Sequence, residues 1–273
     1  MQGKLYVVGT PIGNLGDFSP RAVETLKKVD FIAAEDTRVT VKLLNHFAIK
    51  KPLISYFEHN KAVKGDMIIS RILAGENCAI VTDAGMPAIS DPGEELVKMA
   101  HQRGVTVESV PGPSAVITAL AISGMPSGRF CFEGFLSVNK QSRKQHLDEI
   151  KNEKRTMIFY EAPHKLLATL KDMAAVLGDR PISVVKELTK LHETVLNTTL
   201  CHAVEYFTDN APKGEYVLII GGCKADEKKE YTLDEAVKIA QKLMEDGMST
   251  AAAAKEAAGV SGIKKGDIYK QII

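Results

Sequence analysis

The chain has 273 residues, of which 45% are hydrophobic and 25% are charged, a composition typical of a globular protein with room for two domains. Its formal net charge of +1 lacks the basic excess that is typical of nucleic-acid-binding proteins, although a local basic patch remains compatible with this total. The longest apolar stretch, AVITALAIS at 115–123, is too short to span a membrane.

Residues 1–120 predict an α/β domain with a mostly parallel sheet. Short apolar runs alternate with helical segments such as 20–28, which begins at Ser19-Pro20, and 92–102. Alternating strands and helices form βαβ units, in which ligands bind beyond the carboxyl ends of the strands. The expected strands are 5–8, 31–34, 52–57, 78–83 and 105–110.

Residues 121–224 predict a second α/β domain, with helices near 141–153 and 164–177. Its last two strands are not regularly interleaved with helices, so we expect a mixed sheet. Two α/β domains that face each other favour a ligand cleft between them. The expected strands are 129–134, 156–162, 181–187, 193–199 and 215–222.

Residues 230–273 predict a small helical module. Thr232 and Glu235 form a T-x-x-E capping box, Ser249 is expected to cap an Ala-rich helix that ends at Gly259, and Ser261 is expected to cap a third helix. Three short helices resemble a helix-turn-helix, but acids and bases balance here. A nucleic-acid-binding role and a purely structural role therefore both remain open.

Four loops at expected strand ends are richer in Gly and Pro than simple turns. The first has G-x-x-x-G-x-x-G spacing, which matches neither a dinucleotide fingerprint nor a P-loop. The fourth begins a helix at Ser114, whose first amides are free to bind a ligand. Four such loops on one sheet edge predict a binding site. They read GTPIGNL (9–15), AEDTR (34–38), TDAGMPAISDPG (82–93) and VPGPSA (110–115).

These loops, together with FYEAPHK, KELTKLHE and KGEYVLIIGG, resemble in their order the class III, tetrapyrrole-methylase-like family of S-adenosylmethionine-dependent methyltransferases. They are most similar to its branch that modifies small-subunit ribosomal RNA. This resemblance implies 2′-O-methylation of a cytidine ribose in the decoding region of 16S rRNA, within the 30S subunit, by a homodimer. Other family members carry a GDPxxxG-type sequence where this chain has DAGMPAIS (83–90), which points away from a tetrapyrrole substrate.

The resemblance also implies which residues contact the methyl donor, S-adenosylmethionine, in a cleft between the two α/β domains. The first and third of these loops reach the donor from the first domain, the serine and alanine of PGPSA hold its polar groups, and the second domain lies near the adenine. The implied contacts are Pro11, Ile12, Val81, Thr82, Asp83, Met86, Ser114, Ala115, Tyr160, Glu161, Glu187 and Leu188.

The predicted catalytic residues are Asp36, Arg38 and Lys186. A ribose hydroxyl is a poor nucleophile, so a base should help to remove its proton; Glu35, Asp36, His59, Lys186 and Glu187 are the candidates. We favour Asp36 as base or orienting group, with Arg38 binding a phosphate in a bidentate manner. An ordinary salt-bridged helix start is the alternative interpretation of these two residues.

Two other classes of function remain open: a methyltransferase that acts on a tetrapyrrole or other small molecule, and a donor-binding module without activity. The four cysteines lie far apart and show no metal-ligand spacing, which favours a reducing cytosol and no metal cofactor. No signal-peptide pattern precedes the first strand, so we expect a cytoplasmic protein that does not bind membranes.

Overall fold

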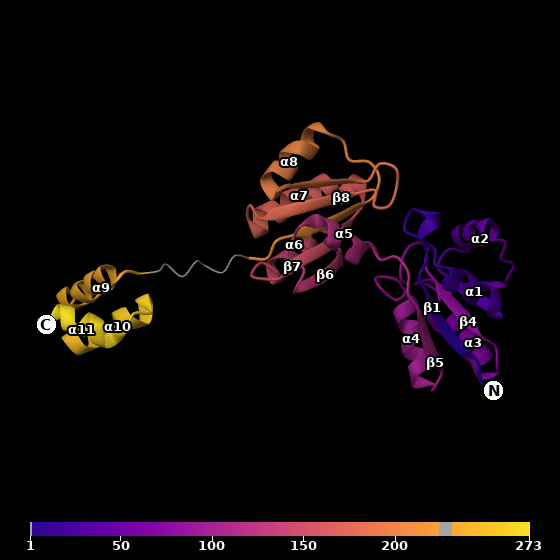
Figure 1. Cartoon of the computed structure of the whole chain (residues 1–273), viewed down its shortest axis with the longest axis horizontal. Coiled ribbons are helices and arrows are strands. Elements are labelled where there is room, and N and C mark those ends of the chain that lie inside the picture. The colour runs from indigo at the N-terminus through magenta and orange to yellow at the C-terminus, as the bar shows by residue number, and fades with distance from the viewer. Residues whose placement is uncertain (1, 224–230) are drawn as a thin grey trace. The chain divides into compact units, whose positions relative to one another are not determined.

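The computed structural model describes residues 2–223 and 231–273, which belong to two compact units, Met1–Cys223 and Lys224–Ile273 (Figure 1). The first unit contains two five-stranded sheets and the second contains three helices. The predicted fold class, two α/β parts followed by a helical segment, is confirmed.

The first sheet is entirely parallel, with strand order β3-β2-β4-β1-β5. Helices α3 and α4 pack on one face of it through Ile68, Ile72 and Leu96, and α1 and α2 pack on the other through Leu26 and Leu44. Burial on both faces explains why its central strands are continuously apolar. The elements are β1 Lys4–Val8, the 3-10 turn Leu15–Asp17, α1 Pro20–Lys28, β2 Phe31–Ala34, α2 Thr37–His46, β3 Leu53–Ser55, α3 Lys61–Leu73, β4 Cys78–Val81, α4 Gly93–Gln102 and β5 Thr106–Val110.

The second sheet is mixed, as predicted, with strand order β6-β7-β10-β8-β9. Only β6 and β7 pair in parallel; β10 runs antiparallel to both of its neighbours. Helices α6, α7 and α8 cover one face through a core that includes Leu147, Leu170 and Phe207. The elements are β6 Phe130–Phe135, α6 Lys140–Glu149, β7 Thr156–Glu161, α7 Pro163–Leu177, β8 Pro181–Lys186, β9 Thr194–Thr199, α8 Leu200–Asp209 and β10 Tyr216–Ile220.

Helix α5, Ala115–Ser123, joins the two sheets. It is apolar on nearly all sides, and its residues Val116 and Leu120 pack on the remaining face of the second sheet together with Ile12 from the first loop. The domain boundary expected at residue 120 therefore falls inside a helix that the second sheet holds. This shared core places the strand-end loops of the two sheets against each other.

The second unit contains α9 Leu233–Glu245, α10 Thr250–Ser261 and α11 Lys265–Ile272 around a small alanine-rich core. The capping box of Thr232 and Glu235 is present.

Three predicted helix limits were wrong. Helix α10 continues past Gly259 and ends at Ser261, where Gly262, with a φ of 73°, supplies the left-handed cap, and Lys264 rather than Ser261 precedes α11. Helix α6 ends at Glu149, not at residue 153.

Candidate active site

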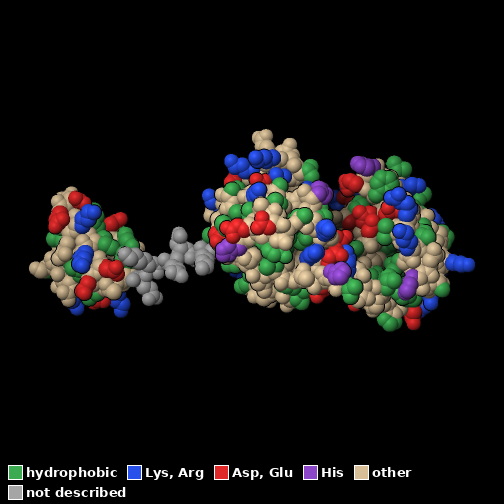
Figure 2. All heavy atoms as spheres, turned by 90° about the horizontal axis from the view of Figure 1, so that it is seen from above, with side chains coloured by type: hydrophobic (Ala, Val, Ile, Leu, Met, Phe, Trp, Pro, Cys, Tyr) green, Lys and Arg blue, Asp and Glu red, His purple; other side chains and the backbone are tan. Residues whose placement is uncertain are grey.

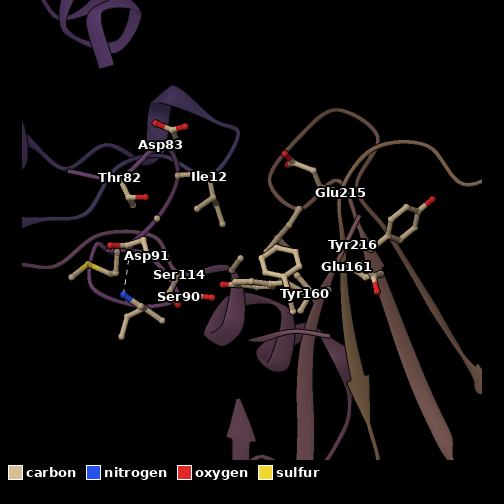
Figure 3. Close-up of a pocket in the computed structure, with 18 of the residues that line it drawn as sticks. Ile12, Thr82, Asp83, Ser90, Asp91, Ser114, Tyr160, Glu161, Glu215 and Tyr216 are labelled. Carbon is tan, nitrogen blue, oxygen red and sulfur yellow. Dashed lines mark hydrogen bonds between the residues drawn. The ribbon is translucent and has the colours of Figure 1, made fainter. Parts of the chain in front are cut away.

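A cavity of about 550 Å³ lies between the two sheets of the first unit, a size within the range for small-molecule sites (Figure 3). Its first wall consists of the loops after β1, β2, β4 and β5. Its second wall consists of residues at the ends of β6, β7, β8 and β10.

Backbone contacts hold the first wall together. The loops after β1 and β4 exchange two hydrogen bonds, Thr10 N to Gly85 O at 2.9 Å and Gly85 N to Thr10 O at 3.2 Å. The loop after β1 also meets the loop after β5, because a Cβ on Gly9 would lie 2.7 Å from Gly112 Cα, closer than real contacts allow. The glycines in this wall are therefore required for three chain segments to meet.

The loop after β4 is strained and firmly anchored. Gly85, Ala88 and Ser90 have φ angles of 89°, 67° and 68°, and two of these residues are not glycine. The carboxylate of Asp91 accepts the backbone N–H groups of Ala88 and Gly93 at 3.0 and 2.8 Å. Burial raises the pKa of Asp91, while these hydrogen bonds oppose the shift. Such strain in an anchored loop is typical of ligand-binding sites.

Acidic groups line the first wall, and Figure 2 shows acidic side chains gathered where the two halves of the first unit meet. Thr82 Oγ1 donates to Glu35 Oε2 at 2.5 Å, and Asp83 Oδ1 accepts the backbone N–H of Asp36 at 3.1 Å. Burial, reinforced by the charge of Glu35, raises the pKa of Asp83 above its usual value. A positively charged ligand group would be stabilised against this wall.

The second wall is mainly aromatic and aliphatic, with Tyr160, Leu188, Tyr216 and Val217 among its residues. The ring of Tyr160 packs against Phe132 with their centroids 5.0 Å apart. Burial raises the pKa of the Tyr160 phenol, and a hydrogen bond from the Val116 backbone amide, at the start of α5, opposes the shift.

One buried carboxylate in the second wall is fully paired. Glu161, 3% exposed, accepts the backbone N–H of Ala162 at 2.8 Å and the Thr169 hydroxyl at 2.5 Å, and its carboxylate lies 3.1 Å from Lys165 Nζ. These contacts occupy its oxygens, so Glu161 fixes the end of β7 instead of offering a free charge.

Most of the residues predicted to contact the donor line this one cavity. Among those that do not, Val81 is buried in β4, and Pro11 lines an adjoining cavity of about 250 Å³ that shares Thr82 and Asp83. Glu187 instead accepts from Lys190 Nζ and from Glu215 N, both at 3.0 Å. The predicted residues that line the cavity are Ile12, Thr82, Asp83, Met86, Ser114, Ala115, Tyr160, Glu161 and Leu188.

The three predicted catalytic residues are not among those that line the cavity. Asp36 is the N-cap of α2 and accepts the Arg38 backbone N–H at 2.8 Å, and Arg38 Nη2 lies 2.6 Å from its other oxygen. The hydrogen bond from Arg38 lowers the pKa of Asp36 to about 2. These contacts correspond to the salt-bridged helix start, whereas Glu35, a weaker candidate in the sequence, lines the cavity.

Several residues that line the cavity were not among the predicted donor contacts. Tyr216 and Val217 begin β10 and Glu215 precedes it; this amino end reaches the cavity edge because β10 is antiparallel to its neighbours. Loops at the carboxyl ends of strands do not include such residues. Phe135 and Ile89 line the cavity as well.

Among the residues that the structure describes, no group of three or more His, Cys, Asp or Glu side chains is placed to hold a metal ion. Likewise, no helix in residues 2–223 and 231–273 is long and apolar enough to cross a membrane.

The fold agrees with a comparison to protein families. The model of the Tetrapyrrole (Corrin/Porphyrin) Methylases matches residues 4–203, and the chain belongs to this family. Within it, the chain is 46% identical to a Synechocystis protein named Ribosomal RNA small subunit methyltransferase I, over 98% of this chain and 96% of that protein. A protein of the same name from Escherichia coli O157:H7 is 43% identical, over 98% and 94%.

A relative from Thermotoga maritima with the same name is 46% identical but aligns over only 81% of this chain while covering 99% of its own length. About a fifth of this chain therefore has no counterpart there.

Solved structures at low identity share the fold alone. Diphthine synthase superposes with a TM-score of 0.65 at 13% identity, over 81% of this chain and 90% of that one. A uroporphyrin-III C-methyltransferase from Thermus thermophilus, in complex with S-adenyl homocysteine, superposes with a TM-score of 0.55 at 19% identity, over 80% and 97%.

Proposed function

We propose that this protein transfers a methyl group from S-adenosylmethionine to the 2′-hydroxyl of a cytidine ribose in the decoding region of 16S rRNA. The observation that carries the proposal is the single cavity that gathers strand-end loops of both sheets, in a chain 43–46% identical to proteins named for methylation of small-subunit ribosomal RNA. The chain would act as a homodimer on the 30S subunit in the cytoplasm.

The two walls of the cavity fit the two ends of the donor. The rings and aliphatic side chains of the second wall suit a flat adenine, and the acidic first wall suits a sulfonium and an ammonium group. Ser114 lies at the N-cap of α5 but makes no capping hydrogen bond, which leaves its hydroxyl available for the donor's polar groups. When bound, S-adenosylmethionine supplies an electrophilic methyl group on a positively charged sulfur.

The residues of the first wall would orient the acceptor and take up its proton. Displacement at a methyl group needs an in-line oxygen, so the rigid, bridged loops after β1 and β4 provide positioning. We assign the role of base to the carboxylate of Asp83, which lines the cavity. Burial and the nearby charge of Glu35 raise the pKa of Asp83 toward neutral pH, where a base is most effective. Asp36, the base favoured by the sequence, is instead paired with Arg38.

The charge of the cavity favours a nucleoside over a tetrapyrrole that carries several carboxylates. Glu35, Asp83 and Asp91 line the cavity without a paired cation, Glu161 and Glu215 are paired with Lys165 and Lys190, and no lysine or arginine appears among the described lining residues. A polycarboxylate would be repelled there. A ribose and its base are neutral, and the RNA phosphates can stay outside, near Lys42, which lines the adjoining cavity.

A homodimer is supported by the exposed side of α5. Ile117 and Ile122 are 54% and 40% exposed in the single chain, and burying them against a second copy would remove apolar surface from water. Light scattering at micromolar protein concentration should give twice the chain mass of 29.7 kDa, and a monomer mass would contradict this part of the proposal.

The function is tested by incubating the protein with tritiated donor and 30S subunits from cells that lack the modification. We expect label in a single cytidine of 16S rRNA, resistant to alkaline cleavage because the 2′-oxygen is methylated. Label on the base, or no label while a small-molecule acceptor is methylated, would overturn the proposal.

A further inference from the structure

Phe135 is an aromatic side chain that the proposed donor contacts leave unused. It ends β6, it is 55% exposed, and it lines the cavity. An aromatic ring this exposed beside a cavity has apolar surface available for a ligand, since burial of such a ring is strongly favourable.

A β-bulge points Phe135 to the cavity side. The pairing of β6 with β7 shifts between Phe132, opposite Ile158, and Gly134, opposite Phe159, so that Phe135 pairs with Tyr160. In a regular strand, residues 132 and 135 would lie on opposite faces; the extra residue puts both on the face of Tyr160. The ring centroids of Phe132 and Phe135 accordingly lie 5.0 and 5.4 Å from that of Tyr160.

The strained loop after β4 supplies an apolar group to the same end of the cavity. Ile89 lies between the two left-handed residues Ala88 and Ser90, is 53% exposed, and lines the cavity. Ser90 is adjacent to the bulge, because its Oγ lies 3.7 Å from where a Cβ of Gly134 would be. Figure 3 shows Ser90 and Tyr160 on opposite walls. Phe135 and Ile89 are thus the two large, exposed apolar side chains among the described residues that line the cavity.

Positively charged side chains lie near Phe135 in space or follow it in the sequence. Lys165 Nζ lies 5.7 Å from the centroid of the Phe135 ring, within the range of a cation–π contact. The segment from 138 to 155, which follows Phe135 directly, carries six Lys or Arg against three acids, and Lys140 and Lys144 are exposed on α6. A neutral ring against Phe135 would leave an attached phosphate near Lys165.

We infer that Phe135 stacks on an unpaired nucleobase of the RNA substrate, with Ile89 covering the other side of that base. The inference rests on the proposed function, since it gives the acceptor RNA a contact separate from the donor site. Proteins recognise unpaired bases by stacking them on aromatic side chains, and enzymes that modify nucleotides inside RNA take them out of the stack.

The test compares Phe135→Leu, Phe135→Trp and a control, Tyr206→Leu, in methylation of 30S subunits. Tyr206, 49% exposed on α8, is not among the residues that line the cavity. We expect Phe135→Leu to raise KM for 30S by about 5- to 150-fold, the range for loss of one stacked base. Phe135→Trp should restore KM, and Tyr206→Leu should leave it unchanged. Melting temperature and S-adenosylhomocysteine affinity by calorimetry should stay within error for all variants.

Three results would overturn the inference. An unchanged KM in Phe135→Leu, while the wild type is active, removes the base contact but leaves the proposed function intact. If Phe135→Leu weakens S-adenosylhomocysteine binding by as large a factor as it raises KM for 30S, the ring contacts the donor instead of the RNA. A wild type that methylates no RNA overturns the proposed function, and the inference with it.

Discussion

The wall of the cavity built by the first sheet is largely backbone, whereas the wall built by the second sheet is largely side chain. In the first, Gly9, Gly85 and Gly112 let loops touch, and carboxylates lie on that frame. In the second, rings and aliphatic groups provide the surface, and its buried carboxylate, Glu161, is fully paired. A Cβ added at one of these glycines should therefore disrupt the first wall. Changes in the size of a side chain, or the loss of an aromatic ring, should affect ligand binding at the second wall only gradually.

The largest expected effect comes from Asp83→Asn in the first wall. If this carboxylate accepts the hydroxyl proton, kcat should fall about 10²-fold or more, with a smaller change in donor affinity. Because its pKa is raised, wild-type kcat should fall as pH drops through a value above the usual 3.8, when the carboxylate becomes protonated. The variant should lack this acidic limb in single-turnover rates, and full-rate methylation by Asp83→Asn would remove it from the mechanism.

The next effect tests the backbone frame directly, by adding one methyl group at Gly9→Ala. Its Cβ would lie 2.7 Å from Gly112 Cα and 2.8 Å from Gly112 N, so the loops must separate. Overpacking of this kind costs about 1–3 kcal/mol. We expect donor binding at least about 10-fold weaker by calorimetry and a lower melting temperature. Gly128→Ala is the matched control, since a Cβ there meets nothing within 4 Å. Equal donor affinity in both variants would show that donor binding does not need the close contact between Gly9 and Gly112.

A smaller effect is expected from Glu161→Gln in the second wall. The substitution removes the charge paired with Lys165 and disturbs the hydrogen bond from Thr169, so the buried end of β7 should lose about 1–3 kcal/mol. Thermal unfolding measures the loss. Glu153→Gln, which changes a more exposed pair with Arg155, should have little effect. If the melting temperatures of both variants change by the same amount, the contacts of Glu161 do not stabilise the end of β7 more than those of an exposed ion pair.

The smallest effect is expected from Asp36→Asn, outside the cavity. Asn caps a helix as well as Asp does, and the Arg38 side chain is 87% exposed, so the methylation rate should change less than about 3-fold. The pKa of Asp36 is lowered to about 2, so its ion pair stabilises the fold above about pH 4, and this contribution is lost as pH falls toward 2. Melting temperatures of wild type and variant should converge there. A 100-fold rate loss would instead establish Asp36 as the base.

Part of the site could be predicted from the sequence because its signals are local. The glycines and prolines of 9–15, 82–93 and 110–115 end apolar runs, and parallel strands bring such ends to one edge. Ile12, Thr82 and Ser114 could therefore be expected near one another. For the second sheet, Tyr160 and Leu188 came from the family resemblance and not from any local pattern.

The remaining features depended on contacts between distant segments. Strand direction in the second sheet brought Tyr216 to the cavity, and a bulge that no local pattern marks turned Phe135 toward it. The pairing of Asp36 with Arg38, and the burial that raises the pKa of Asp83, are likewise properties of the folded chain.

The sequence by itself therefore determined the order of strands and helices and the glycine loops, because backbone preferences and hydrophobic periodicity depend on a few neighbouring residues. It also determined the family, through short motifs that occur in a fixed order. Only the tertiary structure decided that Glu35, and not Asp36, lines the cavity, and which side chains form the wall opposite it. Burial and charge depend on neighbours that the chain brings together from far apart.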